Sequence, residues 1–179
     1  MAIAKTLFRF LLSILFILLV IGIFLPSNAT LEKNIKIQAS ANKIFPHINE
    51  MILFYEWTPW NKISRNTEVS FEGKNKGIGA KIVWKNPDNE INNGNIVISK
   101  SEVDRLVKMN FNFGGKFQGE STFFLEQGSS NFTNMKWKIE AEFGWDLFSR
   151  YTGLLFEKII GETYQDGLMD LKNKIERNE

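Results

Sequence analysis

The sequence predicts an α+β fold in which a seven-stranded antiparallel sheet wraps around one long C-terminal helix, preceded by an N-terminal transmembrane helix. Three observations carry this prediction. The chain opens on a long apolar stretch, its middle alternates apolar and polar residues between turn signals, and its C-terminal part repeats apolar residues at helical spacing.

The composition sets limits on both fold and function. A chain of 179 residues with 44% hydrophobic residues suffices for one domain with a sizeable core. The sequence has no cysteine and one histidine, His47, which excludes disulfide scaffolds, thiolate chemistry and cysteine or three-histidine metal sites. Apart from Lys5 and Arg9, the chain carries 20 basic and 20 acidic side chains, a balance that argues against nucleic acid as a partner. We expect no metal and no cofactor.

Residues 7–25 are predicted to form a transmembrane anchor. They contain one charged side chain, Arg9, and as a helix would measure roughly 28 Å, close to the ~30 Å hydrocarbon thickness of a bilayer. Pro26 ends the helix. A cleaved signal peptide is the alternative, because residues 27–29 form a small-x-small cleavage site. The length of the apolar stretch favours the anchor, since cleaved signals usually have shorter ones.

The charges beside this stretch predict its orientation. Lys5 and Arg9 favour a cytoplasmic N-terminus, residues 1–6, and therefore an extracytoplasmic C-terminal domain on a single-pass membrane protein. Residues 26–30 are interpreted as a linker and residues 31–179 as the domain.

The domain begins with a strand and two short helices. Leu31, Ile35 and Ile37 alternate with polar residues, which is the period of a half-buried strand. Ser40 is a candidate N-cap for a helix that Pro46 would break or kink. A second short helix is predicted over residues 49–56.

Six more strands are predicted after residue 66. Glycine- and asparagine-rich turns separate them, and no connection is long enough for a crossover helix, so the strands should form an antiparallel meander. The predicted strands are Thr67–Glu72, Gly79–Lys85, Ile91–Ser101, Leu106–Phe113, Ser121–Gln127 and Thr133–Phe143. The last is the clearest, because its large apolar side chains alternate strictly with lysines and glutamates.

A long helix over residues 145–177 is predicted to cover the apolar face of this sheet. Apolar residues recur there at helical spacing, with most charged residues off the stripe. Gly153, Gly161 and Gly167 interrupt the pattern, and they either allow close approach to the sheet or mark a bend.

The order of elements and several local strings resemble one family, the SRPBCC proteins (the START and Bet v 1-like, helix-grip superfamily), and within it the membrane-anchored branch labelled polyketide cyclase/dehydrase. The resemblance covers roughly residues 30–177, and it rests on the ordered set because no single string is specific. The strings are Trp57-Thr58-Pro59-Trp60, Gly77-Ile78-Gly79-Ala80 leading to Trp84, Gly94, Gly119-Glu120-Ser121-Thr122, Thr133 to Trp137, Ile160-Gly161, Gly167-Leu168 and Leu171-Lys172.

The resemblance implies a cavity between sheet and helix that takes a lipid or another hydrophobic small molecule, and it implies no universal catalytic residue. The aromatic residues at inward positions fit such a site. The predicted walls are Trp84, Val107, Met109, Phe111, Phe113, Phe123, Trp137 and Ile139 on the sheet and Phe148, Thr152, Leu155 and Ile159 on the helix. Trp57 and Trp60 either line the entrance or anchor the short helices to the sheet.

Two other functions stay open. One is a cyclase or dehydratase that uses the same cavity, and the other is a structural or interaction module whose core is filled. His47 and Glu120 are the candidate catalytic groups, but a structural histidine and a solvated turn carboxylate fit their positions better. We therefore expect no catalytic residue and favour binding or transport of a hydrophobic ligand.

Overall fold

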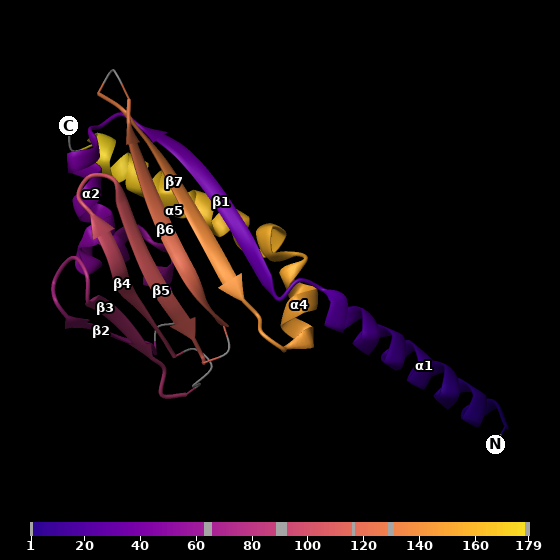
Figure 1. Ribbon diagram of the computed structural model, residues 1–179. Helices are drawn as coiled ribbons and strands as arrows, with labels where there is room; N and C mark the ends of the chain where they lie inside the picture. Colours follow the sequence, from indigo (N-terminus) through magenta and orange to yellow (C-terminus); the bar gives the residue numbers. More distant parts are fainter. Residues whose placement is uncertain (1, 63–65, 89–92, 116, 129–130, 178–179) are drawn as a thin grey trace.

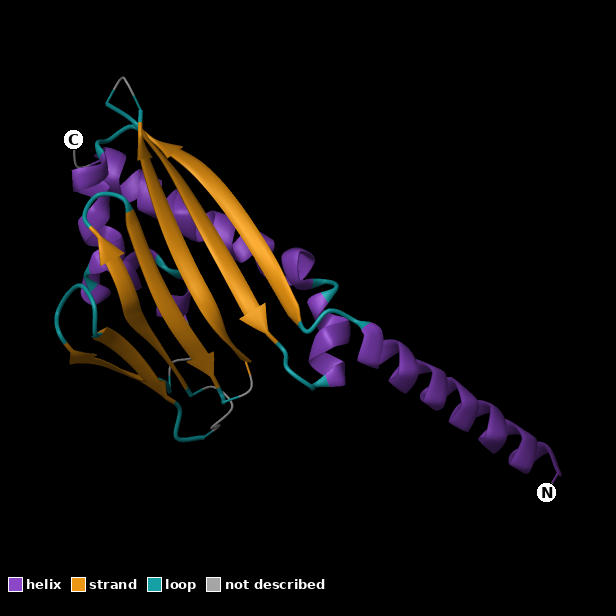
Figure 2. Ribbon diagram, viewed as in Figure 1, coloured by secondary structure: helices purple, strands orange, loops and turns teal. Residues whose placement is uncertain are grey.

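The computed structural model describes residues 2–62, 66–88, 93–115, 117–128 and 131–177. One antiparallel sheet curves around a long C-terminal helix, and the N-terminal helix α1 (Ala2–Phe24) projects away from this domain (Figure 1). The predicted α+β fold with its N-terminal apolar helix is confirmed. The helices of the domain lie on one side of the sheet and leave its other side open (Figure 2).

The sheet has seven strands in the order β1-β7-β6-β5-β4-β3-β2, and every neighbouring pair is antiparallel. All but one of these pairs join strands consecutive in sequence. The exception is β1 with β7, which places the start of the domain beside its last strand. The strands are β1 (Asn28–Ile37), β2 (Glu68–Gly73), β3 (Ala80–Lys85), β4 (Gly94–Glu102), β5 (Leu106–Phe113), β6 (Phe117–Gln127) and β7 (Thr133–Glu142).

Two strands begin three or more residues earlier than predicted. β1 begins at Asn28, opposite Glu142, so most of the segment interpreted as a linker is paired with β7 instead. β6 begins at Phe117, four residues before the predicted start at Ser121, because Phe117 pairs with Phe113 across the turn. The predicted start of the fourth strand at Ile91 lies outside the described residues.

Two short helices, α2 (Ala41–Asn49) and α3 (Met51–Trp57), follow β1. Ser40 is the N-cap residue of α2 as predicted, but the Ala41 amide donates to Gln127 Oε1, at 2.7 Å, in place of a capping side chain. Of the two effects predicted for Pro46, a break or a kink, the break is wrong. Pro46 lies inside α2, where it removes one backbone hydrogen-bond donor. The helix ends three residues later, because Glu50 has an extended backbone and forms a β-bridge with Lys76.

The C-terminal segment forms two helices, α4 (Leu147–Gly153) and α5 (Phe156–Arg177), instead of the single helix predicted. A turn at Leu154 and Leu155 separates them. Gly153 has no room for a side chain, since a Cβ there would lie 3.0 Å from Cζ of Phe143. The turn lets α4 pack on α1 while α5 follows β1.

The other two glycines of this segment lie inside α5 and allow close approach. A Cβ at Gly167 would lie 3.2 Å from Pro59 Cδ, and one at Gly161 would lie 3.2 Å from Lys33 Nζ. These glycines bring α5 against β1 and against the segment that follows α3. Of the two interpretations of the glycines, close approach holds for Gly161 and Gly167, and the bend lies next to Gly153.

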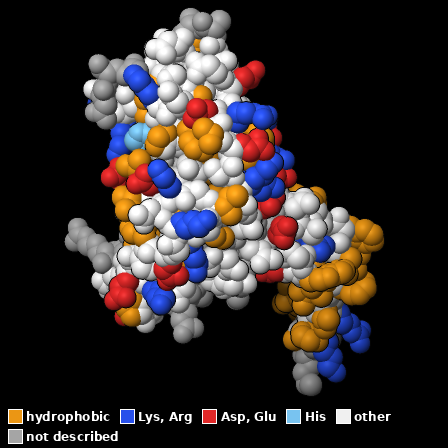
Figure 3. All heavy atoms as spheres, turned by 60° about the vertical axis from the view of Figure 1, so that its left-hand side comes forward, with side chains coloured by type: hydrophobic (Ala, Val, Ile, Leu, Met, Phe, Trp, Pro, Cys, Tyr) orange, Lys and Arg blue, Asp and Glu red, His pale blue; other side chains and the backbone are white. Residues whose placement is uncertain are grey.

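Helix α1 has the length and apolarity of a membrane span. Residues 3–24 have a mean hydropathy of 2.8 and only 6% of that stretch is buried in the protein. Figure 3 shows hydrophobic side chains gathered on α1, with basic side chains near its free end, whereas the face of the domain seen in this view carries a mixture of charged, polar and scattered apolar groups. A signal sequence meets the same criterion of length and composition.

Candidate hydrophobic ligand site

The inward side chains of the sheet meet those of the short helices in one aromatic cluster. Its sheet members occupy alternate strand positions, which place them on the face that α3 and α5 cover. The cluster contains all the sheet residues predicted for the ligand site together with the two tryptophans after the short helices: Trp57, Trp60, Trp84, Val107, Met109, Phe111, Phe113, Phe123, Trp137 and Ile139. All are buried except Phe113, which is half-buried.

Trp60 lies at the centre of this cluster. It belongs to the one-turn 3₁₀ helix η1 (Pro59–Lys62), and its ring centroid lies 6.2 Å from that of Trp84, 6.2 Å from that of Phe113 and 6.0 Å from that of Trp137. From α5, Tyr164 approaches the same ring at 5.9 Å. Trp60 therefore occupies the space in which a cavity was predicted, between the sheet and the C-terminal helix.

The helix residues predicted for the site are not part of this cluster. Phe148, Thr152, Leu155 and Ile159 are exposed, so the prediction that they face the sheet is wrong. The turn after α4 changes the phase of the helical stripe. The buried face of α5 instead begins one residue later and contains Phe156, Tyr164, Leu168, Leu171 and Ile175.

Trp57 anchors the short helices, which was one of its two predicted roles. Its indole Nε1 donates to the carbonyl oxygen of His47 at 2.9 Å and thereby joins α3 to α2. Its ring lies 5.5 Å from that of Trp137. Both tryptophans of the Trp-Thr-Pro-Trp string therefore hold this segment against the sheet.

The indole donors of the cluster are satisfied unequally. Trp137 donates from Nε1 to Ser121 Oγ at 2.7 Å, and this bond is buried. The Nε1 of Trp84 is also buried, yet it has no acceptor within the part of the chain that the structure describes. Leaving a buried donor unpaired costs about 1–3 kcal/mol.

A surface hollow of about 760 Å³ lies beside the strand segment that carries Trp84. It lies where β3 and β5 end and β4 begins, and it is lined by residues that include Trp84, Asn93, Gly94 and Gly114. Gly94 is required here, since a Cβ would lie 2.6 Å from Cδ1 of Phe113. Phe113 and Phe117 are the half-buried aromatic residues at this end of the cluster.

Ionisable groups lie mostly away from the cluster. Tyr164 is the exception, and burial raises the pKa of its phenol, so the hydroxyl stays protonated at neutral pH. Burial, and next the charge of Lys174, lower the pKa of His47, whose Nδ1 has no acceptor or donor within the described residues. His47 is half-buried on α2 and is not a member of the aromatic cluster.

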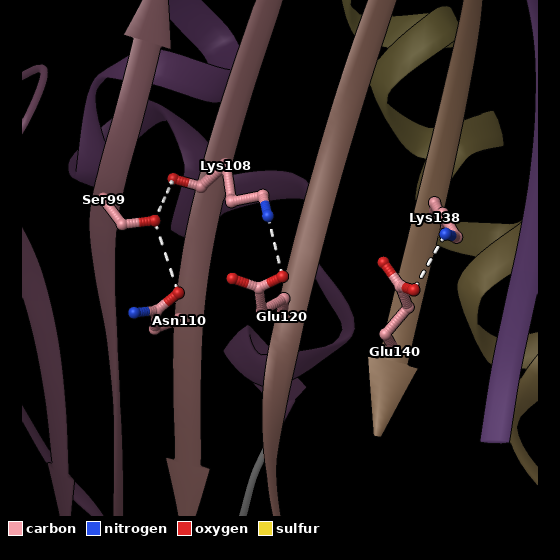
Figure 4. A network of polar contacts seen from close by, with 6 residues as sticks. All are labelled: Ser99, Lys108, Asn110, Glu120, Lys138 and Glu140. Atoms are coloured by element: carbon pink, nitrogen blue, oxygen red, sulfur yellow. Dashed lines mark hydrogen bonds and ion pairs between the residues drawn. The ribbon is translucent and has the colours of Figure 1, made fainter. Parts of the chain in front are cut away.

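The strand carboxylates of Glu120 and Glu140 lie on the open face of the sheet (Figure 4). Glu120 pairs with Lys108 of the neighbouring strand at 2.7 Å, and Glu140 pairs with Lys138 of its own strand at 2.8 Å. Ser99 donates to the Lys108 carbonyl and to Asn110 Oδ1, both at 3.3 Å. This polar layer belongs to a solvent-facing surface.

Several members of the cluster were not predicted from the sequence. Tyr164 and Phe54 are absent from the predicted site, and Phe117 falls between two predicted strands. The signal for Phe117 is the two-residue alternation with Gly119 and Ser121, which extends the sixth strand backwards. Nothing in the local sequence signals that Ser121 would satisfy Trp137, because the two lie on different strands.

Neither a family model nor a curated protein matches this sequence. Solved structures match its fold. Norcoclaurine synthase from Thalictrum flavum, in complex with dopamine and hydroxybenzaldehyde, is 10% identical over 88% of this chain and 91% of its own, with a TM-score of 0.62. A protein of unknown function from Staphylococcus aureus is 14% identical over 84% and 96% of the two chains, with a TM-score of 0.59. An uncharacterised protein from Rhizobium leguminosarum is 14% identical over 84% and 95%, with a TM-score of 0.55.

At these identities the likeness establishes the fold alone. The fold is Bet v 1-like, the helix-grip arrangement that the sequence resemblance implied. Proteins of this fold commonly bind ligands, and in this chain the space between sheet and α5 holds aromatic side chains.

Proposed function

We propose that this Bet v 1-like protein is a membrane-anchored binding or transport module for a hydrophobic small molecule or lipid. The observation that carries the proposal is the buried Nε1 of Trp84, which lacks an acceptor among the described residues and lies in an aromatic cluster with half-buried Phe113 and Phe117. A ligand with a carbonyl, ether or hydroxyl oxygen would accept this hydrogen bond. Its apolar part would replace aromatic contacts, at about 25 cal/mol per Å² of apolar surface buried.

Binding requires Trp60 to leave the centre of the cluster. Trp60 is carried by a single 3₁₀ turn in which Asn61 donates two hydrogen bonds. The Asn61 backbone amide donates to the Thr58 carbonyl oxygen at 3.2 Å, and its Nδ2 donates to the Glu56 carbonyl oxygen at 2.7 Å. Such a turn has few bonds to break compared with a helix or a strand. We therefore assign Trp60 the role of a plug, which the ligand displaces.

Retention of α1 as an anchor is supported by its contacts with the domain. Arg150 is buried, and its guanidinium donates to the carbonyl oxygens of Ile23, at 2.9 Å, and Leu25, at 3.4 Å. Signal cleavage near residue 29 would remove these acceptors from a charged group. Lys5 and Arg9 support a cytoplasmic N-terminus, with the domain on the other side of the membrane.

The binding proposal is tested with the full chain in phospholipid nanodiscs. Tryptophan fluorescence is followed while an isoprenoid ketone, a fatty acid, or the hydrocarbon that corresponds to the ketone is added. We expect saturable binding, with the ketone bound more tightly than the hydrocarbon. Trp84→Phe should abolish this preference, because it removes the donor and keeps a ring.

Trp60→Ala provides the second arm of the test. Removing the plug should lower the Kd for the same ketone about tenfold, which corresponds to about 1.4 kcal/mol. Val103→Ala, a change at an exposed turn residue, is the matched control and should leave the Kd unchanged. Equal affinity of native protein and Trp60→Ala for the ketone would contradict the role of Trp60 as a plug.

A second candidate function is favoured by the filled interior itself. In that case the domain works through its surfaces, as a structural or interaction module, and neither the native chain nor Trp60→Ala binds any apolar ligand saturably. Activity as a cyclase or dehydratase has less support. Among the described residues, Tyr164 is the ionisable side chain that contacts the aromatic cluster. Its phenol stays protonated, so it cannot act as a general base. A hydrophobic binding site remains the function that the geometry supports best.

A further inference from the structure

Helix α4 is fixed to the last two turns of α1. The hydroxyl of Tyr151 donates to the Leu18 carbonyl at 2.5 Å, and Arg150 links the carbonyl of Ile23, at 2.9 Å, to that of Gly144, at 2.6 Å. Gly22 permits this approach, since a Cβ there would lie 3.2 Å from Cε2 of Tyr151. The two helices therefore form one unit at the point where α1 leaves the domain (Figure 1).

Large apolar side chains beside this junction are exposed. Trp145 is 81% exposed and Phe148 is 77% exposed, and Leu154 and Leu155 at the end of α4 are exposed as well. We call these four residues the junction patch. Single exposed apolar side chains are ordinary, but four on one short segment mark a surface that contacts another apolar phase.

The level of α4 along α1 indicates which phase this is. Leu18 precedes Phe24 by six residues, so at 1.5 Å per residue it lies about 9 Å below the end of α1. Amphipathic helices at a membrane surface bury their apolar face about 5–10 Å into the boundary between headgroups and acyl chains. A helix that touches Leu18 and Gly22 therefore lies at that depth whenever α1 spans a bilayer.

The residues of the junction patch also suit an interface. Tryptophan is enriched at the headgroup level, where an aromatic ring contacts both apolar and polar groups. The Trp145 ring lies 5.1 Å from the guanidinium carbon of Arg150, which keeps a cation beside it. On α4, Leu147, Arg150 and Tyr151 contact α1, while Phe148 is exposed and can contact lipid.

We propose that the junction patch inserts into the headgroup region of the same bilayer that α1 crosses, so that the domain rests on the membrane through α4. This inference rests on the proposed retention of α1 as an anchor. The bilayer is favoured over a second copy or a protein partner because the patch is continuous with the membrane span itself. Docking of this kind would place the domain next to a source of hydrophobic ligands.

The experiment uses the absence of cysteine from the native chain. Single cysteines are introduced by Phe148→Cys and, as the matched control, by Val103→Cys in the exposed turn between β4 and β5. Each full-length variant is labelled with an environment-sensitive fluorophore and reconstituted in nanodiscs. We expect a nitroxide on the upper acyl chain to quench the Phe148→Cys label at least fivefold more strongly than the Val103→Cys label. A water-soluble quencher should show the reverse order.

The native chain supplies an independent measurement. Four of its five tryptophans are buried, so brominated lipids should quench mainly Trp145, and Trp145→Phe should remove most of that quenching. Equal lipid quenching at positions 148 and 103, with the chain still in the nanodiscs, would overturn the inference. The inference would also be overturned if the label at position 148 were protected from the water-soluble quencher only at high protein concentration and were not quenched by the nitroxide lipid. That result would indicate contact with a second copy of the chain. Loss of residues 1–29 from the chain isolated from membranes would instead refute the anchor.

Discussion

Trp137 and Ser121 form a buried hydrogen bond between two adjacent strands, with 2.7 Å between Nε1 and Oγ. The indole donor of Trp137 therefore has an acceptor, whereas the buried Nε1 of Trp84 has none among the described residues. One indole of the cluster is thus fixed by the protein, while the other retains a donor that a ligand can use.

Ser121→Ala is expected to destabilise the protein by about 1–3 kcal/mol, because it leaves the Trp137 donor buried and unpaired. The measurement is the free energy of unfolding in urea, made on the full chain in detergent micelles. Ser99→Ala is the matched control. Its hydroxyl is exposed on the open face of the sheet, so the change should stay within about 0.5 kcal/mol. Equal effects of the two substitutions would show that the buried bond contributes nothing.

Gly119→Ala is expected to destabilise the protein by about 3 kcal/mol, at the upper end of the range for overpacking. The new methyl would contact the Glu140 carbonyl oxygen, which belongs to the paired backbone of β7, and would lie 2.8 Å from Cζ of Phe111. Neither group can move without disturbing the sheet.

Gly77→Ala separates this steric effect from ordinary glycine strain. Gly77 has a φ of 71°, and nothing lies within 4 Å of the place that an alanine methyl would take, so only the left-handed backbone is penalised. A loss of about 1–2 kcal/mol is expected there. A smaller loss for Gly119→Ala than for Gly77→Ala, again in urea unfolding, would contradict the close approach of β6 to β7.

The stability of the protein should fall as the pH drops below about 6.5, and His47 is the expected cause. Burial first, and the charge of Lys174 second, lower the pKa of His47, against weaker opposite effects of Glu56 and Glu50. Well above about pH 6.5 the imidazole is neutral in both the folded and the unfolded state. As the pH falls from there through the folded-state pKa, the unfolded chain binds the proton first, so the free energy of unfolding decreases.

His47→Gln should remove this part of the pH dependence. Urea unfolding of both proteins at about pH 7.5 and about pH 5.5 measures it, in a range above the titration of ordinary carboxylates. The native protein should lose more stability between the two values than the variant does. Parallel losses in both proteins would assign the effect to other groups.

The alternation of large and polar residues was enough to predict the sheet and the sheet side of the aromatic cluster. Trp84, Phe123 and Trp137 lie on the predicted face, because a strand fixes the side of each residue by its parity alone. The pairing of β1 with β7 does not follow from this parity, because parity leaves the order of strands in the sheet open, and it is known from the structure.

The C-terminal helix could not be placed as well from sequence. Its apolar residues form two overlapping stripes, one through Phe148 and Leu155 and one through Phe156 and Tyr164, and periodicity alone does not choose between them. The choice depends on the turn at Leu154, which exists because α4 contacts α1 and α5 contacts β1. Whether the space between sheet and helix is open depends on the position of one side chain, Trp60, which no local pattern fixes.

Native mass spectrometry of the full chain, released from nanodiscs or from its own membrane, shows directly whether the domain holds an apolar ligand. We expect a stoichiometric adduct of one apolar, oxygen-containing molecule. That adduct should weaken in Trp84→Phe and strengthen in Trp60→Ala, while Val103→Ala matches the native chain. If all four proteins appear only at their ligand-free mass, even with excess isoprenoid ketone present, the domain has a permanently filled core and the proposed binding function is wrong.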